Sequence, residues 1–302
     1  MSPTSRPPAD TARDLAAWRE VAKALAHEAA RMIQEATPTG TWIEKAPGDW
    51  CSALDAAVEQ HLRQRLAARF PDHGFFGEEG HAQPFAPDGA HTPVWVVDPI
   101  DGSANFIRGY PQYAISIAAV QGGEPVAGCI LDPVRGECFS AALGHGADCN
   151  GQPLSVSRTP SLIQGLAGTV FPKPASPLMA PYLRELESAL RQCGGVRRSG
   201  SMALELAYLA AGRLDVFWER GMGPWDAAAG LLLVREAGGE VWALDGLPWW
   251  RSQALAAATP TLRADWGAMW PGWLDPPTQG EVDRLAAAGA AMPSRRKASG
   301  GA

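Results

Sequence analysis

The stretch VVDPIDGSANF, residues 96–106, constrains the fold of this chain more than any other. It continues an apolar run that predicts a buried strand, and Asp98 stands where that strand should end. Pro99 fixes φ and Gly102 permits a turn that other residues resist, so the side chains of Asp98 and Asp101 can converge on one point. The chain therefore needs a fold in which a buried strand ends on two neighbouring acids.

Two carboxylates this close together repel each other unless a cation lies between them. Hard oxygen ligands suit Mg²⁺, and the carbonyl of Ile100 is free to join them. From Gly102 onward the residues can open a helix, whose free N–H groups and positive dipole end suit a phosphate. The plainer alternative makes Asp98 part of a turn and Asp101 or Ser103 a helix cap, and the short motif alone leaves both interpretations open.

The composition argues against several classes of protein. The chain has 302 residues, of which 46% are hydrophobic, so it can bury a substantial core. Its net charge is −6 and its Lys and Arg residues are scattered, unlike the basic patch of a nucleic-acid-binding protein. The 5 Cys include no C-x-x-C pair and the 6 His show no metal-ligand spacing, which argues against a disulfide framework and a zinc site. There is no signal-peptide core and no membrane-length apolar stretch, so we expect a cytoplasmic protein.

Apolar periodicity predicts a chain of mixed helices and strands. The central strands suggest an antiparallel sheet, and the later alternation of helices and strands suggests βαβ-like layers. In chain order, the expected elements are helices at 13–35 and 52–69, strands at 94–97, 113–120, 126–132 and 137–141, a helix at 201–211, a strand at 214–219, a helix at 224–239 and a strand at 240–244.

We expect the chain to divide into two folded halves between flexible ends. The ends are rich in Pro, Ala, Gly and Arg, and a Gly/Pro-rich region lies between the halves. The predicted segments are a disordered lead-in at 1–12, an N-terminal α+β half at 13–158 with Glu78 and the DPIDGS site, a C-terminal α/β half at 159–274 with Glu219 and the WDAAAG motif, and a disordered tail at 275–302.

Two further acidic stretches support the metal interpretation. FFGEEGH places Glu78 and Glu79 after a short aromatic run, and GPWDAAAG places Asp226 at a predicted helix start. Taken singly, GEEG is typical of a solvated acidic loop, and Asp226 of a helix cap. Their occurrence in one chain with the Asp98 motif favours a shared acidic site.

Together these stretches resemble the inositol monophosphatase-like family of Mg²⁺-dependent, lithium-sensitive phosphatases. The family's signature D-P-[IL]-D-G-[ST]-x-N-F is matched by residues 98–106, and its W-D-x-A-A-G by residues 225–230. The upstream G-E-E is matched by residues 77–79, and the D-x-x-[ST]-x-x-D element by residues 49–55. Order and spacing agree from about residue 16 to residue 260. The resemblance implies a layered αβαβα sandwich of the sugar-phosphatase type, in the α+β or α/β class.

The resemblance also implies a metal site. Glu78, Asp98 and the Ile100 carbonyl would hold one Mg²⁺, and Asp98, Asp101 and Asp226 would hold a second, with two or three ions in all. Asp101 and Asp226 would also face the substrate.

Further roles follow from the same resemblance. Gly102 and Ser103 would bind the phosphate through backbone N–H groups, and Glu219 would contact a substrate hydroxyl. The Ser103 hydroxyl, paired with Asp55, would help Glu78 to orient and deprotonate the attacking water. Ser103 replaces a commoner threonine but keeps its hydroxyl.

The implied activity is hydrolysis of a small phosphate monoester by a metal-activated water, without a phosphoenzyme. Inositol 1-phosphate is the first candidate substrate, and a small phosphorylated polyol is the expected partner. Histidinol phosphate is the alternative, because some members with similar FWERGxxPWD segments serve histidine synthesis; fructose 1,6-bisphosphate or a nucleotide comes next. An alternative of another class is a non-catalytic regulatory binding protein on this fold.

Two departures from the family pattern and one aromatic segment are left without a role. Met202 and Glu205 occupy positions where smaller or amide residues are frequent. The family resemblance implies a homodimer, and the aromatic segment 246–273, with Trp249 and Trp250, suggests either a subunit contact or ordinary surface packing.

Overall fold

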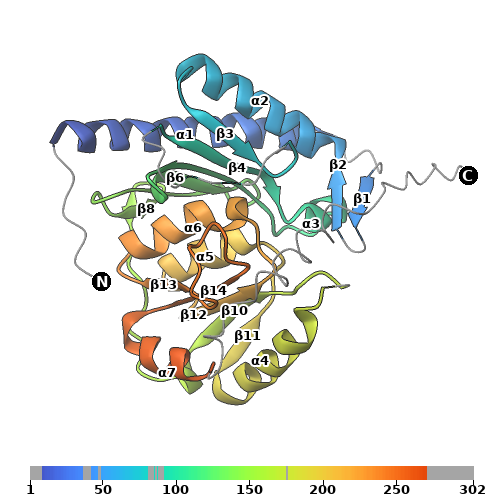
Figure 1. Ribbon diagram of the computed structural model, residues 1–302, viewed down its shortest axis with the longest axis vertical. Coiled ribbons are helices and arrows are strands. Elements are labelled where there is room, and N and C mark those ends of the chain that lie inside the picture. The colour runs from blue at the N-terminus through green and yellow to red at the C-terminus, as the bar shows by residue number, and fades with distance from the viewer. Residues whose placement is uncertain are drawn as a thin grey trace, which may run out of the picture.

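The structure, a computed structural model, describes residues 9–36, 42–46, 49–80, 85, 87, 92–174 and 176–270. Five layers of secondary structure stack in the order helix, sheet, helix, sheet, helix (Figure 1). One apolar cluster joins the outer helices to the first sheet, a second surrounds the middle helices, and a third joins the second sheet to the opposite outer helices. The predicted αβαβα sandwich is therefore confirmed.

The first sheet has seven strands in the order β3-β4-β5-β6-β7-β8-β9. β3 pairs with β4 in parallel, and the other neighbours are antiparallel. Helices α1 and α2 cover one face of the sheet with apolar side chains such as Leu25 and Leu62. The bounds are α1 Ala9–Glu35, α2 Ala53–Arg69, β3 Gly74–Gly77, β4 Val94–Asp101, β5 Ala114–Gln121, β6 Glu124–Asp132, β7 Glu137–Ala142, β8 Ala147–Cys149 and β9 Gln152–Pro153.

The second sheet has five strands in the order β11-β10-β12-β14-β13. β10 is parallel to β11 and β12, whereas β14 is antiparallel to both β12 and β13. Tyr182, Trp218 and Trp266 belong to the apolar cluster that packs α4 and α7 on its outer face. The bounds are η1 Leu162–Gln164, β10 Leu166–Val170, α4 Met179–Gln192, β11 Gly195–Arg197, β12 Val216–Arg220, β13 Glu240–Ala243, β14 Ala254–Ala258, η2 Pro260–Leu262 and α7 Arg263–Ala268.

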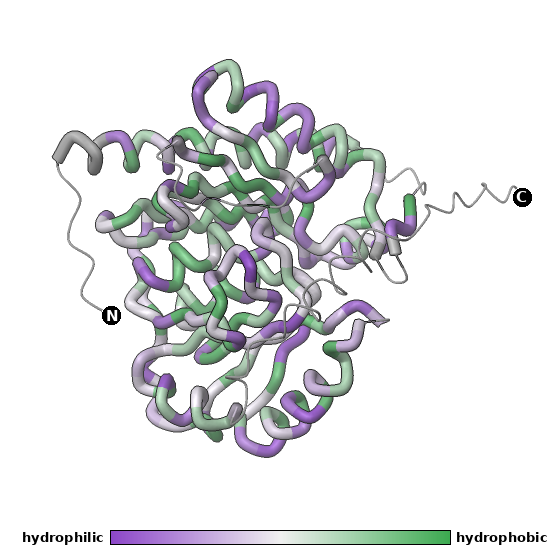
Figure 2. Tube along the Cα trace, in the orientation of Figure 1, coloured by the Kyte–Doolittle hydropathy of each residue, from purple (hydrophilic) through white to green (hydrophobic). Residues whose placement is uncertain are grey.

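Helices α5 (Met202–Ala210) and α6 (Pro224–Glu236) form the middle layer, between the two sheets (Figure 1). Eight of the nine residues of α5 are buried, because both of its faces are covered. Figure 2 shows apolar residues along these two helices and along the strands of both sheets. Neither these nor any other helix in the described part of the chain is long and apolar enough to cross a membrane.

A two-stranded hairpin, β1 (Trp42–Ala46) and β2 (Asp49–Ser52), lies outside both sheets and packs beside the short helix α3 (Ser103–Ile107). The sequence predicted only a break between two helices here. Figure 1 shows the hairpin and α3 at the same edge of the molecule, next to the carboxyl end of β4.

Most of the predicted elements are present, with shifted ends. Helix α1 begins at Ala9, so residues 9–12 are helical and do not belong to a disordered lead-in. Residues 1–8 and the predicted tail, 275–302, lie outside the described residues. The predicted division after residue 158 falls between β9 and η1, and it stays a prediction, since α5 and α6 pack against both sheets. The prediction missed β3, β10, β11, β14, α4 and α7.

Of the two adjacent tryptophans at positions 249 and 250, the first is buried and the second is half-buried. Trp249 is 6% exposed and donates its indole N–H to the carbonyl of Gly123 over 2.8 Å. The ring of Trp250 lies against the same glycine, where a Cβ would be 2.8 Å from its nearest ring atom. Trp249 is therefore a core residue, and the suggested subunit contact does not include it.

Candidate metal and phosphate site

Strand β4 supplies two of the acids from its carboxyl end. In a regular strand Asp98 and Asp101 would point to opposite faces, because side chains alternate. The register against β5 shifts between them, where Pro99 and Ile100 oppose a single residue. Such a bulge reverses the alternation, and Pro99 is suited to it because proline has no N–H to give to a ladder. Both carboxylates therefore face the same side.

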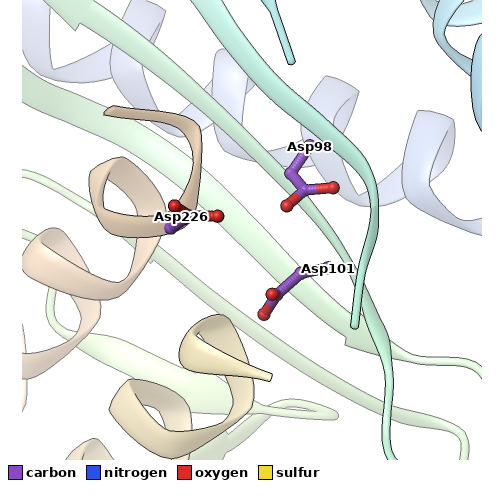
Figure 3. Close-up of side chains that lie close together, drawn as sticks. All are labelled: Asp98, Asp101 and Asp226. Atoms are coloured by element: carbon purple, nitrogen blue, oxygen red, sulfur yellow. The ribbon is translucent and has the colours of Figure 1, made fainter. Parts of the chain in front are cut away.

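Asp226 reaches the same place from the first turn of α6. Asp98, Asp101 and Asp226 each offer a carboxylate oxygen, and these atoms all lie within 4.8 Å of one another. Figure 3 shows the three side chains pointing toward one another from β4 and α6. The structure thus brings together three of the predicted metal ligands from distant parts of the sequence.

Local hydrogen bonds fix two of these carboxylates. Asp98 accepts a hydrogen bond from the N–H of Ile100 over 3.0 Å. Asp226 accepts one from the N–H of Gly223 over 2.6 Å and so caps the start of α6. The helix-cap interpretation of Asp226 is therefore correct, and it does not compete with a place in the cluster.

Asp101 is held from the opposite side by the start of α5. Its Oδ2 accepts a hydrogen bond from the Ser201 hydroxyl over 2.6 Å and another from the N–H of Ala203 over 2.7 Å. The orientation of this carboxylate consequently depends on the segment that leads into α5.

The site is electrostatically strained without a cation. Burial raises the pKa of Asp98 and Asp226 well above the ordinary value, and neighbouring acids add to the effect. Burial also raises the pKa of Asp101 to about 6. Three ionised carboxylates in this position are unfavourable unless a positive charge neutralises them. Hard carboxylate oxygens are the ligands that Mg²⁺ prefers, so this set of donors fits a hard divalent cation.

Glu78 lies beside this cluster rather than within the group of three. Lys45, on β1, places its Nζ 3.2 Å from a carboxylate oxygen of Glu78 and 2.5 Å from one of Glu79. After burial, the negative charge of Glu78 is the largest influence that raises the pKa of Asp98. Glu78 therefore interacts electrostatically with Asp98 and at the same time forms an ion pair with Lys45.

The predicted pair of Ser103 and Asp55 forms a direct contact. The Ser103 hydroxyl lies 2.6 Å from Oδ1 of Asp55 and 2.9 Å from the carbonyl oxygen of Ile100, so it can donate to either. The other oxygen of Asp55 accepts hydrogen bonds from the N–H and the hydroxyl of Ser52 over 2.8 and 2.6 Å. Asp55 is fully buried, and these donors fix both of its carboxylate oxygens in place.

Gly102 occupies a position where any residue with a side chain would be strained. Its φ is +93°, and a Cβ there would lie 3.0 Å from the carbonyl oxygen of Gln112 and 3.1 Å from that of Gly200. It precedes α3, whose first N–H groups have no partner within the helix. Gly102 and Ser103 are thus placed at the carboxyl end of β4, beside the acidic cluster.

Glu219 enters the same region from β12. It is 5% exposed, and its Oε2 has no hydrogen-bond partner among the described residues. Burial raises its pKa well above the ordinary value, and the charges of Asp226 and Asp101 add to this. A buried acid with an unpaired oxygen is available to bind a polar group of a ligand.

Several residues that build the site were missed by sequence reasoning. Glu59 is 3% exposed and accepts a hydrogen bond from the N–H of Glu79 over 2.7 Å. Its spacing of one helical turn from Asp55 could have indicated it, because both lie on the same face of α2. Lys45 lies on a hairpin that no periodic pattern in the sequence indicates. Ser201 stands at the start of a predicted helix, but the sequence did not identify it as a partner of Asp101.

Comparison with known proteins agrees with this geometry. A sequence model of the inositol monophosphatase family matches residues 14–268. The inositol-1-monophosphatase of Rhizobium meliloti is 43% identical over 201 residues, which cover 67% of this chain and 74% of that protein. The Nus factor SuhB of Xylella fastidiosa is 42% identical over 199 residues, 66% of this chain and 70% of that protein.

Solved structures show the same likeness. The extragenic suppressor protein SuhB from Bartonella henselae has a TM-score of 0.75 at 36% sequence identity, and the match covers 84% of this chain and 98% of that chain. The match thus extends well beyond the acidic motifs. The chain therefore belongs to the inositol monophosphatase family of phosphoric monoester hydrolases.

Proposed function

We propose that this protein hydrolyses a small phosphate monoester with the help of Mg²⁺, and that inositol 1-phosphate is its first candidate substrate. The observation that carries the proposal is the meeting of Asp98, Asp101 and Asp226 within 4.8 Å of one another. The relative from Rhizobium meliloti, which is named inositol-1-monophosphatase, supports the choice of substrate.

Five groups of this chain would hold the metal. Asp98, Asp101 and Asp226 form the shared cluster, and Glu78 and the Ile100 carbonyl complete the set. When bound, Mg²⁺ neutralises charge on the phosphoryl oxygens and lowers the pKa of water. We expect two or three ions, and we expect Li⁺ to inhibit, as the family resemblance implies.

The other residues bind the substrate and carry the proton. The N–H groups of Gly102 and Ser103 would hold the phosphate, and the unpaired oxygen of Glu219 would accept a hydrogen bond from a hydroxyl of the leaving group. Ser103 can receive a proton from the attacking water while its own hydroxyl proton passes to Oδ1 of Asp55, 2.6 Å away. Glu78 would orient that water.

The proposal needs no nucleophilic side chain. Phosphate monoesters hydrolyse extremely slowly without help, and positioning with charge neutralisation supplies most of the acceleration in phosphoryl transfer. A phosphoenzyme would require an activated side chain beside a base. Ser103 is paired with a carboxylate, and we assign it to proton transfer.

A panel of substrates tests the proposal. Purified protein with Mg²⁺ would be assayed against inositol 1-phosphate, histidinol phosphate, fructose 1,6-bisphosphate and a nucleotide, and kcat/KM compared. We expect inositol 1-phosphate to have the highest value. A higher value for histidinol phosphate would identify the alternative substrate, and no Mg²⁺-dependent release of phosphate from any of them would contradict the proposal.

A second candidate function is regulatory. Relatives such as the one from Xylella fastidiosa are named Nus factor SuhB, which favours a role in addition to hydrolysis. In cells that lack the native gene, an Asp98→Asn variant separates the two roles. If this variant restores the phenotype lost in those cells, a regulatory function independent of phosphate release is supported. If it does not, the phenotype depends on hydrolysis.

The oligomeric state and the location stay predictions. The family resemblance implies a homodimer, which sedimentation velocity of the purified protein would test. A cytoplasmic location rests on the sequence alone.

A further inference from the structure

Glu205 is a buried acid that the proposed chemistry does not use. It lies on α5 and is 1% exposed. Its Oε1 accepts hydrogen bonds from the N–H of Ser199 over 2.9 Å and from the hydroxyl of Ser199 over 2.6 Å. Burying an acid costs free energy. The two hydrogen bonds to Ser199 are therefore expected to have a function.

The second sheet makes room for the Glu205 carboxylate. A Cβ at Gly168, on β10, would lie 2.7 Å from Oε2 of Glu205 and 2.8 Å from the side chain of Leu214. A larger residue at position 168 would displace the acid. The fold thus leaves space beside β10 that the Glu205 carboxylate fills.

Ser199 is also held from its other side. The side-chain amide of Asn105 donates to the carbonyl of Ser199 over 2.8 Å and to that of Gln112 over 2.6 Å. Gly200 follows with φ +90°, and a Cβ there would lie 2.9 Å from the same amide nitrogen. The segment 199–200 is therefore clamped between α5 and α3.

The clamped segment leads directly to a proposed metal ligand. The next residue, Ser201, donates its hydroxyl to Oδ2 of Asp101, and Ala203 donates its N–H to the same oxygen. We propose that Glu205 is a positioning residue that, by fixing Ser199, sets the orientation of Asp101 for metal binding. This inference rests on the proposed function.

Glu205 could also act only by stabilising α5, and an experiment has to separate that structural role from the positioning of Asp101. Glu205 lies in the first turn of α5, where an acidic side chain can stabilise a helix. Loss of that effect would lower stability without changing metal affinity. The distinguishing measurement is therefore the affinity for a metal ion, recorded separately from activity.

The experiment measures Mn²⁺ binding by electron paramagnetic resonance in wild type, Glu205→Ala, Glu205→Gln and Leu209→Ala. Outer-shell substitutions typically weaken metal binding by about 10- to 100-fold, and Glu205 acts one hydrogen bond further out, so we expect a rise of about 5- to 10-fold in Kd for Glu205→Ala. Glu205→Gln keeps an oxygen acceptor and should stay within about 2-fold of wild type. In assays, Glu205→Ala should need more Mg²⁺ for half-maximal rate and reach a similar kcat at saturation.

Leu209→Ala is the matched control. Leu209 is a fully buried residue of the same helix, so its loss destabilises α5 and should leave the Mn²⁺ affinity unchanged. If Glu205→Ala does not fold, Ser199→Ala removes only the hydroxyl bond and should give a smaller loss of affinity in the same direction.

Three outcomes would overturn the inference. They are an unchanged Mn²⁺ affinity in Glu205→Ala, an unchanged affinity in Ser199→Ala where Glu205→Ala does not fold, and a loss in Glu205→Gln as large as that in Glu205→Ala. Failure of the wild-type protein to bind any Mn²⁺ would instead contradict the proposed function, so the two failures are distinguishable.

Discussion

At the scale of single residues, the site depends on positions that admit one kind of side chain. Gly102 has φ +93° and two carbonyl oxygens within 3.1 Å of where a Cβ would be. We expect Gly102→Ala to lower the free energy of unfolding by about 2 to 4 kcal/mol. Alanine is strained in the left-handed conformation, and its Cβ would also clash with the two carbonyl oxygens. We also expect kcat/KM to fall at least about 10-fold, since the shift misplaces the phosphate-binding turn. Urea unfolding and steady-state assays measure both.

Gly136 provides a matched control for this substitution. Its φ is +67°, but a Cβ there would have nothing within 4 Å. Gly136→Ala should therefore cost only the backbone strain, about 1 kcal/mol, and leave activity unchanged. Equal effects of the two substitutions would contradict the importance of the close approach at Gly102.

The sequence could predict those site residues that stand in contiguous motifs. Asp98, Asp101 and Gly102 were found because a strand end, a proline and a glycine dictate their geometry locally. The contacts of Asp101 with Ser201 could not be predicted, because they depend on how α5 packs against β4. Lys45 was missed for the same reason, since a short hairpin brings it to Glu78.

At the scale of elements, the distance between α5 and α6 sets the position of two metal ligands. A Cβ at Gly230 of α6 would lie 2.4 Å from Cδ1 and 2.6 Å from Cβ of Leu206 on α5. Alanine usually stabilises a helix interior by about 1 kcal/mol relative to glycine, but overpacking costs about 1 to 3 kcal/mol. We expect Gly230→Ala to destabilise the protein and to weaken Mg²⁺ binding, as measured by calorimetry. The reason is that a wider spacing of α5 and α6 would move Asp226 away from Asp101, which the start of α5 holds in place.

A second helical glycine separates overpacking from helix propensity. At Gly267 of α7 a Cβ would meet only the far end of the Arg263 side chain and no backbone atom. Gly267→Ala should therefore stabilise the protein slightly and leave Mg²⁺ binding unchanged. Weaker binding in this variant too would mean that the effect at Gly230 is not local.

Sequence patterns predicted many of the elements with a clear period, and the elements that were missed have different reasons. The apolar runs of β4 to β7 and the stripe of α2 gave correct assignments. β14, with the sequence ALAAA, carries no strand signal, and it forms a strand because β12 and β13 flank it. β10 and α4 lie in or next to a Gly/Pro-rich region that suggested a boundary.

At the scale of the whole molecule, the buried acids link stability to pH. Burial raises the folded-state pKa of Asp101 to about 6 from an ordinary value of 3.8. The protonated group favours the folded state, so this stability is complete below about pH 4 and is lost as the pH rises through about 6. Mg²⁺ binds the ionised carboxylates, so it should raise the melting temperature more at about pH 7.5 than at about pH 5.

Thermal unfolding with EDTA and with Mg²⁺ at both pH values checks this linkage. Asp226→Asn serves as the control, because removing one charge from the cluster should reduce both the pH effect in EDTA and the gain from Mg²⁺. An equal gain from Mg²⁺ at both pH values in the wild-type protein would contradict the linkage.

The most direct test of the account is Mg²⁺ binding and Mg²⁺-dependent phosphate release in Asp98→Asn, compared with wild type. Asp98 belongs to the cluster and is influenced by the charges of Glu78, Asp101 and Asp226, and the variant removes its charge at nearly constant size. We predict that calorimetry detects no Mg²⁺ bound at this site and that kcat/KM falls at least about 1,000-fold. Unchanged Mg²⁺ binding with undiminished phosphate release would contradict the claim that these carboxylates hold the catalytic metal.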